Sequence, residues 1–143
     1  WSRGLGDVYK RQTLTPGDKL EPLTQKPISR STLALFAGAS GDHNPIHIDI
    51  DFAKSVGLDD VFAHGMLGMA YLGRFLTLFT DQKNLRSYSV RFSSITQVGA
   101  ELKCSGKVTE IFEEQDEKFM KLELSATDQN NDVKLMGDAV IAI

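Results

Sequence analysis

The clearest pattern of polar and apolar residues lies between Lys118 and Thr127, where the two kinds alternate. Met120, Leu122, Leu124 and Ala126 would face one side, and Phe119, Lys121, Glu123 and Ser125 would face the other. A period of two is typical of a half-buried strand. Further strands are predicted over Arg86–Val98, Ala100–Phe112 and Val133–Ile143, with hairpin turns at Gly99-Ala100, Glu113–Glu117 and Asp128–Asp132.

Three helical segments precede these strands. Ser29 is a good N-cap for a short helix that ends near Gly38–Gly41, and Asp49 or Asp51 can cap a second helix that ends near Gly57. From His64 to Phe79 the sequence is apolar on nearly every face, which predicts a buried helix. A long buried helix followed by a meander of strands predicts an α+β fold, in which an antiparallel sheet wraps around a central helix.

Length, charge and hydropathy narrow the class of protein. The chain has 143 residues, which indicates one domain, and its net charge of −3 argues against a dedicated nucleic-acid binder. The longest apolar run, Met66–Phe79, is too short to cross a membrane and contains Arg74. The single cysteine, Cys104, cannot form an internal disulfide. We therefore expect a cytoplasmic protein that binds neither nucleic acid nor membrane.

The first twelve residues, WSRGLGDVYKRQ, have neither helical nor strand periodicity. Asp7–Gln12 resembles the in-frame translation of a transposon end used in preparing sequencing libraries. We therefore expect residues 1–12 to be a non-native scar and residues 13–143 to form a single domain. A natural flexible terminus is the alternative.

The segment Ser40–His47, SGDHNPIH, is the richest in chemically active side chains. Asp42 and His47 lie in one irregular segment that Pro45 constrains, and a carboxylate and an imidazole held together can share one water and divide its protons. Gly65 begins the predicted central helix, where backbone N–H groups lack partners and favour developing negative charge. A carboxylate, an imidazole and a helix-start amide are what enolate chemistry at a thioester requires.

Each of these residues also has a simpler interpretation. Asp42 could act only as a turn cap, and a single histidine is more often structural than catalytic. Three histidines near carboxylates also suggest a metal site, and the residues concerned are His43, His47, His64, Asp42, Asp49 and Asp51. Pro45, however, lies between His43 and His47 and would disrupt the helix that makes their spacing useful for ligating a metal. No metal is therefore expected.

The string SGDHNPIH, with Phe36 six residues before Asp42 and Ala53 six after His47, closely resembles the signature of the MaoC-like (R)-specific enoyl thioester hydratases and dehydratases. The later segment GLDDVFAHGM, the apolar helix and Tyr88–Phe92 also match that family. The resemblance extends over Pro16–Ile143. It implies a hot dog fold, in which an antiparallel sheet wraps a long central helix and two such units pair.

The resemblance also implies roles for individual residues. Asp42 and His47 match the catalytic pair, Gly65 matches the oxyanion-binding amide, and Asn44 is expected to hold the active-site loop and contact the substrate region. His64 and Ser40 are expected to support these groups. Gly73 departs from the pattern, because some members carry a serine there, eight residues after the glycine.

The expected activity is the (R)-specific hydration of trans-2-enoyl thioesters, or the reverse dehydration of (3R)-hydroxyacyl thioesters, in fatty-acid metabolism and with no cofactor. A hot dog acyl thioesterase and a non-catalytic acyl-binding subunit of a heterodimeric dehydratase are the alternatives. The substrate would be an acyl-CoA or an acyl-carrier-protein thioester, and the assembly a homodimer, with a heterodimer as the other choice. Acyl chain length, carrier, direction and which of Asp42 and His47 is the base are left open.

Overall fold

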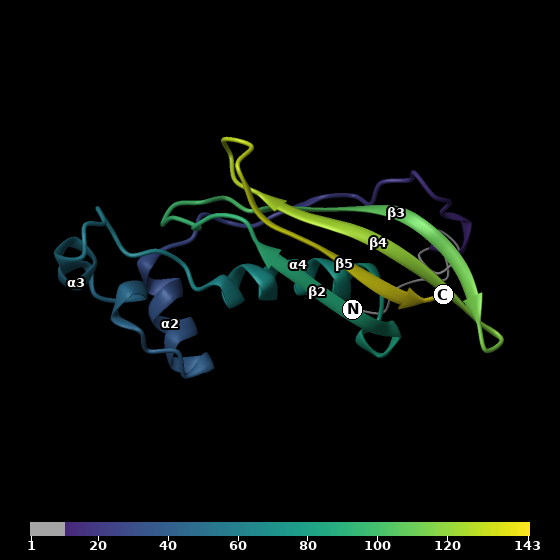
Figure 1. Ribbon diagram of the computed structural model, residues 1–143, viewed down its shortest axis with the longest axis horizontal. Helices are drawn as coiled ribbons and strands as arrows, with labels where there is room; N and C mark the ends of the chain where they lie inside the picture. Colours follow the sequence, from purple (N-terminus) through teal and green to yellow (C-terminus); the bar gives the residue numbers. More distant parts are fainter. Residues whose placement is uncertain (1–10) are drawn as a thin grey trace.

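Five antiparallel strands form one curved sheet in the order β1-β3-β4-β5-β2 (Figure 1). A computed structural model describes residues 11–143 of the chain. The strands are β1 (Leu23–Thr24), β2 (Leu85–Phe92), β3 (Lys103–Glu114), β4 (Glu117–Thr127) and β5 (Val133–Ala142). The helices are α2 (Arg30–Ser40), α3 (Ile50–Ser55) and α4 (Gly65–Phe79), with short 3₁₀ turns η1 (Pro45–His47) and η2 (Gln82–Asn84).

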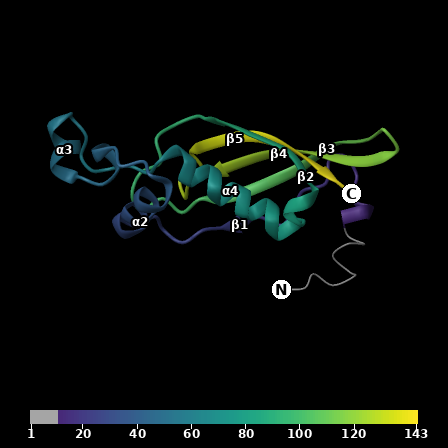
Figure 2. The same cartoon turned by 90° about the horizontal axis from the view of Figure 1, so that it is seen from below.

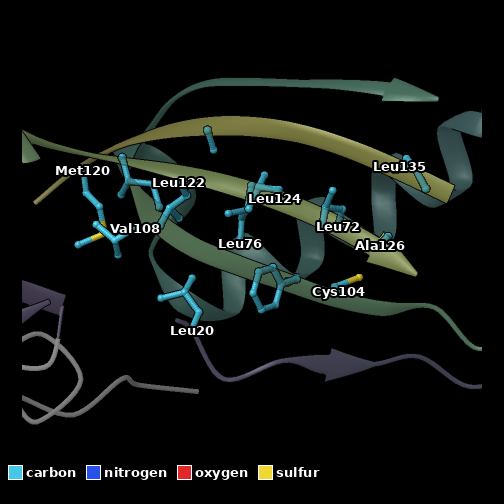
Figure 3. Close-up of a cluster of buried hydrophobic side chains, with 13 residues drawn as sticks. Leu20, Leu72, Leu76, Cys104, Val108, Met120, Leu122, Leu124, Ala126 and Leu135 are labelled. Atoms are coloured by element: carbon cyan, nitrogen blue, oxygen red, sulfur yellow. The ribbon is translucent and has the colours of Figure 1, made fainter. Parts of the chain in front are cut away.

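Helix α4 lies against one face of the sheet, and α2 and α3 lie beyond one end of it (Figure 2). The alternation in β4 sets this arrangement, because every apolar residue on its inner face is fully buried. Against α4, these side chains form the main core with Leu72 and Leu76 of the helix (Figure 3). Burying each large side chain contributes about 1.5–3 kcal/mol. The predicted sheet wrapped on a central helix is therefore confirmed.

The two short helices begin where the sequence predicts. The Ser29 side chain accepts a hydrogen bond from the Thr32 N–H at the start of α2, and the Asp49 side chain accepts from Asp51 and Phe52 at the start of α3. Helix α2 ends at Gly41, whose φ of 78° is a left-handed conformation that glycine adopts without strain. These caps fix both ends of the segment that carries Asp42 and His47.

Two fold-level predictions were wrong. Gly99-Ala100 is not a hairpin turn, because β2 pairs with β5 at one edge of the sheet, so the chain crosses from β2 towards β3 near the other edge. Alternation identifies a strand but not its partner, which explains the error. Helix α4 is also not buried on every face, because Met66 and Leu78 are each 56% exposed in the single chain. No helix in the described part of the chain is long and apolar enough to cross a membrane.

Residues 1–10 lie outside the described residues, so the expectation of a non-native scar stays a prediction. Arg11 falls near the end of the expected scar, residues 1–12, and it donates a hydrogen bond from Nη1 to the Phe79 carbonyl at 3.1 Å.

Cys104 faces the main core, and its burial raises the thiol pKa to about 12. A thiol in that environment is a poor nucleophile at neutral pH.

A glycine allows β2 to lie close to β5. A Cβ at Gly137 would overlap the Ser89 carbonyl oxygen and lie 2.9 Å from the Val90 Cα, and neither backbone atom can move without breaking the pairing. We predict that Gly137→Ala lowers the free energy of unfolding by about 1–3 kcal/mol, as overpacking usually does. Urea unfolding measures this change.

Gly38→Ala is the matched control. Gly38 lies on the exposed side of α2, and a Cβ there meets no atom within 4 Å. The same substitution should therefore stabilise the protein by about 1 kcal/mol through helix propensity. Equal effects of the two substitutions would contradict the close approach of β2 to β5.

Candidate active site

His47 is held in one tautomer by the local backbone. It ends the 3₁₀ turn η1, which Asn44 caps by accepting a hydrogen bond from the Ile46 N–H at 3.1 Å. The imidazole is buried, and its Nδ1 lies 2.8 Å from the Phe62 carbonyl oxygen. A carbonyl oxygen can only accept, so Nδ1 carries the hydrogen and Nε2 of the neutral ring presents a lone pair.

Asp42 lies opposite that lone pair. Its backbone N–H donates to Ser40 Oγ at 3.2 Å, and its Oδ1 accepts from the Asn44 N–H at 3.2 Å. Its Oδ2 lies 4.0 Å from His47 Nε2. That separation is too long for a direct hydrogen bond, but a single water can bond to both atoms. The carboxylate is about half exposed, at 52%, so water can reach it.

His64 links the two predicted catalytic residues. Its ring stacks on the His47 ring with centroids 4.0 Å apart, and the Phe36 ring meets it edge-on at 5.0 Å. Its Nε2 lies 3.1 Å from the Asp42 backbone carbonyl, so Nε2 is the protonated nitrogen. Among the described residues its buried Nδ1 has no hydrogen-bond partner. His64 thus packs against the imidazole of His47 and hydrogen-bonds to the backbone of Asp42.

The side chains of Asp42, His47 and His64 each offer one possible metal-ligating atom, and these atoms lie within 4.8 Å of one another. A metal requires lone pairs that converge on one point. The two imidazole rings are stacked with an angle of 28° between their planes. Lone pairs that lie in nearly parallel planes do not point at a common metal position. His47 Nδ1 and His64 Nε2 are also engaged by backbone carbonyls. This arrangement favours a shared water over a metal ion.

Gly65 follows His64 directly and is the first residue of α4. The helix has no side-chain cap at this end and Gly65 is exposed, so its N–H, which has no hydrogen-bond partner among the described residues, can bind an oxygen atom. A Cβ at this position would lie 3.1 Å from the Phe92 ring. The absence of a side chain at Gly65 therefore leaves space between the start of α4 and the Phe92 ring.

A cavity adjoins Asp42, and its volume of about 600 Å³ is typical of small-molecule sites. Its lining is mostly apolar and comprises Phe36, Ser40, Asp42, Met66, Met69, Ala70, Gly73 and Tyr88. A second cavity of about 330 Å³ lies beside Gly65, where Phe62, Phe92 and Thr96 form part of the wall. Apolar space next to a carboxylate–imidazole pair is suited to an acyl chain whose reactive end meets that pair.

Sequence reasoning missed two groups in this region. The Phe62 carbonyl that fixes His47 is a backbone atom, so no residue type marks it. Tyr88 was given no role beyond its strand and the family match of Tyr88–Phe92, yet its hydroxyl donates to the Met69 carbonyl at 2.6 Å and its ring lines the larger cavity. Burial raises the pKa of Tyr88 well above its usual range. His43, which was a candidate metal ligand in the sequence, has an exposed side chain and is not brought together with Asp42, His47 and His64.

Comparison with known proteins shows the family to which the chain belongs. The model of the MaoC like domain matches residues 11–130, so the chain belongs to the MaoC-like domain family. The 3-hydroxyacyl-thioester dehydratase X of Mycobacterium tuberculosis is 31% identical over 104 residues, which are 65% of this chain. That match spans only 36% of the dehydratase, about a third of its length.

Two further proteins match over most of their length. The (R)-specific enoyl-CoA hydratase of Rhodospirillum rubrum is 27% identical, over 82% of this chain and 81% of the hydratase. The solved structure of the (R)-hydratase from A. caviae involved in PHA biosynthesis superimposes with a TM-score of 0.77 and 26% identity, over 91% of this chain and 97% of that one. The predicted hot dog fold is confirmed by this similarity.

The hydrogen bond from His47 to the Phe62 carbonyl can be tested without measuring enzyme activity, because it fixes the tautomer of the imidazole. We expect ¹⁵N–¹H correlation spectra of the imidazoles, recorded where both rings are neutral, to show His47 protonated at Nδ1 and His64 at Nε2. Exposed His43 serves as the internal reference, because a free imidazole exchanges between the two tautomers. An Nε2-protonated His47 would contradict the assigned geometry.

Proposed function

We propose that the chain catalyses (R)-specific addition of water to trans-2-enoyl thioesters, or the reverse dehydration, with Asp42 and His47 as the catalytic pair. The names of the relatives above agree with a hydro-lyase, which confirms the sequence-based prediction at the level of enzyme class. The observation that carries the residue assignment is the 4.0 Å separation of Asp42 Oδ2 and His47 Nε2, with the His47 Nδ1 bonded elsewhere.

In the hydration direction, the pair holds one water against C3 of the substrate. The water oxygen forms a bond to C3 while the C2–C3 π bond breaks and its electrons move towards the thioester carbonyl. The proton that leaves the water is taken up at His47 Nε2, which has the available lone pair, while Asp42 orients the water. The pair then returns one proton to C2, so that one water is added in total.

The thioester oxygen gains negative charge in this step. The Gly65 N–H is positioned to donate a hydrogen bond to it, and the amino end of the 15-residue helix α4 adds a favourable partial charge. One well-placed donor of this kind is worth about 2.7–4 kcal/mol of transition-state stabilisation. His64 and Asn44 act through the loop, because their hydrogen bonds hold the Asp42 carbonyl and the η1 turn.

The enzyme is proposed to work as a homodimer. Strand β2 is at an edge of the sheet, and α4 leaves Met66 exposed in the cavity that Tyr88 of β2 also lines. Edge strands and exposed apolar side chains are the features that a second copy would cover. The cytoplasmic location and the homodimer stay predictions from the sequence, and the sequence leaves the thioester carrier open.

We predict that Asp42→Asn and His47→Ala each lower the turnover of crotonyl thioester by about 10²–10⁴-fold, because each removes one of the two groups that share the water. A coupled absorbance assay of enoyl thioester consumption measures the rate. His43→Ala is the matched control, since this histidine lies in the same loop but its side chain is exposed. Wild-type turnover in either variant would refute the assignment.

Analysis of the products of the same incubations separates the alternative functions. Release of free thiol with no 3-hydroxy product would identify a thioesterase. Binding of enoyl thioesters without turnover by the purified protein would identify an acyl-binding subunit.

Gly73 is expected to influence the acyl chain length that the enzyme accepts. It lies on α4 in the wall of the larger cavity, and a Cβ there would be in ordinary contact, 3.5 Å from the Tyr88 ring. We predict that Gly73→Leu shifts the preference in kcat/KM towards short enoyl thioesters, because a bulky side chain fills the cavity. Gly73→Ser, which adds one small group, should keep the longer substrates. An unchanged chain-length profile for Gly73→Leu would place the acyl chain elsewhere.

A further inference from the structure

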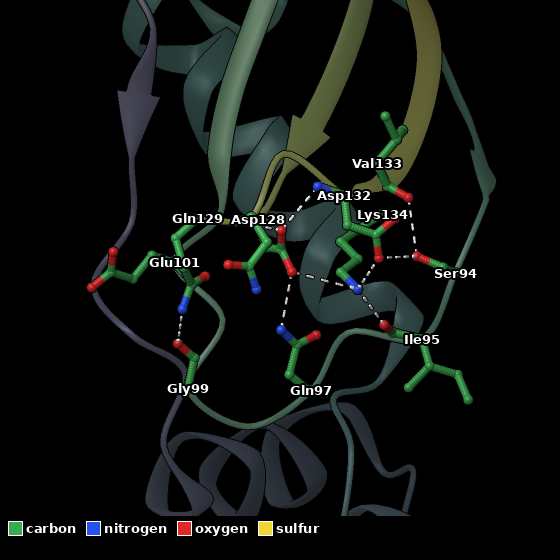
Figure 4. A network of polar contacts seen from close by, with 11 residues as sticks. Ser94, Ile95, Gln97, Gly99, Glu101, Asp128, Gln129, Asp132, Val133 and Lys134 are labelled. Carbon is green, nitrogen blue, oxygen red and sulfur yellow. Dashed lines mark hydrogen bonds and ion pairs between the residues drawn. The ribbon is translucent and has the colours of Figure 1, made fainter.

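A buried cluster of charged side chains lies at one end of the sheet, in the turn between β4 and β5 (Figure 4). Lys134 is only 5% exposed and Asp128 only 4%. The Lys134 ammonium lies 2.7 Å from Asp132 Oδ2 and 3.7 Å from Asp128 Oδ2. Burial of a lysine and an aspartate is costly unless both are paired and hydrogen-bonded. The position of these charges is therefore tightly constrained.

The cluster binds the segment that follows β2, residues 93–97. The Lys134 ammonium donates to the Ile95 carbonyl at 2.9 Å, and Gln97 Nε2 donates to Asp128 Oδ2 at 3.0 Å (Figure 4). The other carboxylate oxygen of Asp128 accepts from the backbone N–H groups of its own turn. The Gln97 hydrogen bond holds the pKa of Asp128 below its usual range despite burial. The Lys134 and Asp128 side chains thus hold residues 95 and 97, while residues 93 and 94 are held by hydrogen bonds to the Lys134 and Val133 carbonyls and to Asp132.

The same segment supports the backbone that fixes His47. The Ala63 N–H donates to the Thr96 carbonyl at 2.8 Å, and Phe62 and Gln97 form an isolated antiparallel bridge. The Phe62 carbonyl in turn accepts the hydrogen bond from His47 Nδ1. Direct hydrogen bonds and one backbone bridge therefore connect the Lys134 cluster to the catalytic imidazole.

We propose that Lys134, together with Asp128, is a positioning residue for His47. The cluster holds residues 93–97, these residues hold the Phe62 carbonyl, and that carbonyl selects the tautomer whose Nε2 faces Asp42. The inference rests on the proposed function of His47, but the tautomer itself can be measured without substrate.

Loss of the cluster should affect turnover more than binding. Neither Lys134 nor Asp128 lines the cavity beside Asp42 that we assign to the acyl chain. Lys134 does border the smaller cavity beside Gly65, so a direct contact with substrate is the competing role. A positioning role predicts a lower kcat and a changed tautomer, whereas direct contact predicts a higher KM and an unchanged tautomer.

The test is the double variant Lys134→Met/Asp128→Asn, which removes the cluster without leaving one buried charge unpaired. We expect kcat on crotonyl thioester to fall by about 10–100-fold, as small displacements of a catalytic group produce, with KM little changed. In the ¹⁵N spectrum, His47 should lose its exclusive protonation at Nδ1. Gln129→Met is the matched control, because Gln129 lies in the same turn and makes two hydrogen bonds, but to residues 99 and 101.

A second variant, Gln97→Met, breaks the hydrogen bond between residues 93–97 and the Asp128 side chain, and decides the question if the double variant does not fold. It should change the His47 tautomer and lower kcat in the same direction. A folded variant with wild-type kcat and an Nδ1-protonated His47 would overturn the proposal, as would a raised KM with an unchanged tautomer. If the wild-type protein lacks hydratase activity, the proposed function fails, and the tautomer measurement still decides whether the cluster positions His47.

Discussion

The hydrogen bond between His47 Nδ1 and the Phe62 carbonyl is the interaction on which the proposed chemistry depends. At 2.8 Å it fixes which nitrogen carries the hydrogen, and so it directs the lone pair of Nε2 towards Asp42. Without it the neutral imidazole could present an N–H there, and a water between the two residues would lose its proton acceptor. One backbone carbonyl therefore decides whether this histidine serves as a base.

The rest of the fold can be understood as support for the two partners in that bond. Helix α2 ends at Gly41, and the following turn delivers Asp42 and then His47 on a short, capped segment. His64 stacks on His47 and holds the Asp42 carbonyl, immediately before α4 begins at Gly65. Because α4 is packed along the sheet by Leu72 and Leu76, the amide at its start has a fixed position relative to the pair.

Much of this architecture could be predicted because it depends on local chemistry. The caps at Ser29 and Asp49 and the alternation in β4 are short-range patterns, and the structure follows them closely. The proximity of Asp42 and His47 followed from one short, proline-constrained segment. His64 lies seventeen residues after His47, and the sequence linked it to the same site only through a possible metal cluster and through the resemblance to a family.

The features that escaped prediction depend on long-range contacts or on backbone atoms. The pairing of β2 with β5 rests on a register in which Gly137 allows close approach, and no local pattern encodes that choice. No sequence pattern marked Lys134 as buried, because a lysine is almost never fully buried unless residues distant in the chain pair with it. The exposed face of α4 was missed because an apolar sequence does not reveal whether the same chain or another one covers it.

The central claim is that a water held between Asp42 and His47 is added to C3 of an enoyl thioester. The most direct measurement is to incubate the purified protein with crotonyl thioester in H₂¹⁸O and to locate the label by mass spectrometry with chiral analysis of the product. The account predicts one ¹⁸O in the 3-hydroxyl group of the (3R) thioester, formed about 10²–10⁴-fold more slowly with Asp42→Asn. Label found instead in the carboxylate of a released acid, together with free thiol, would contradict it.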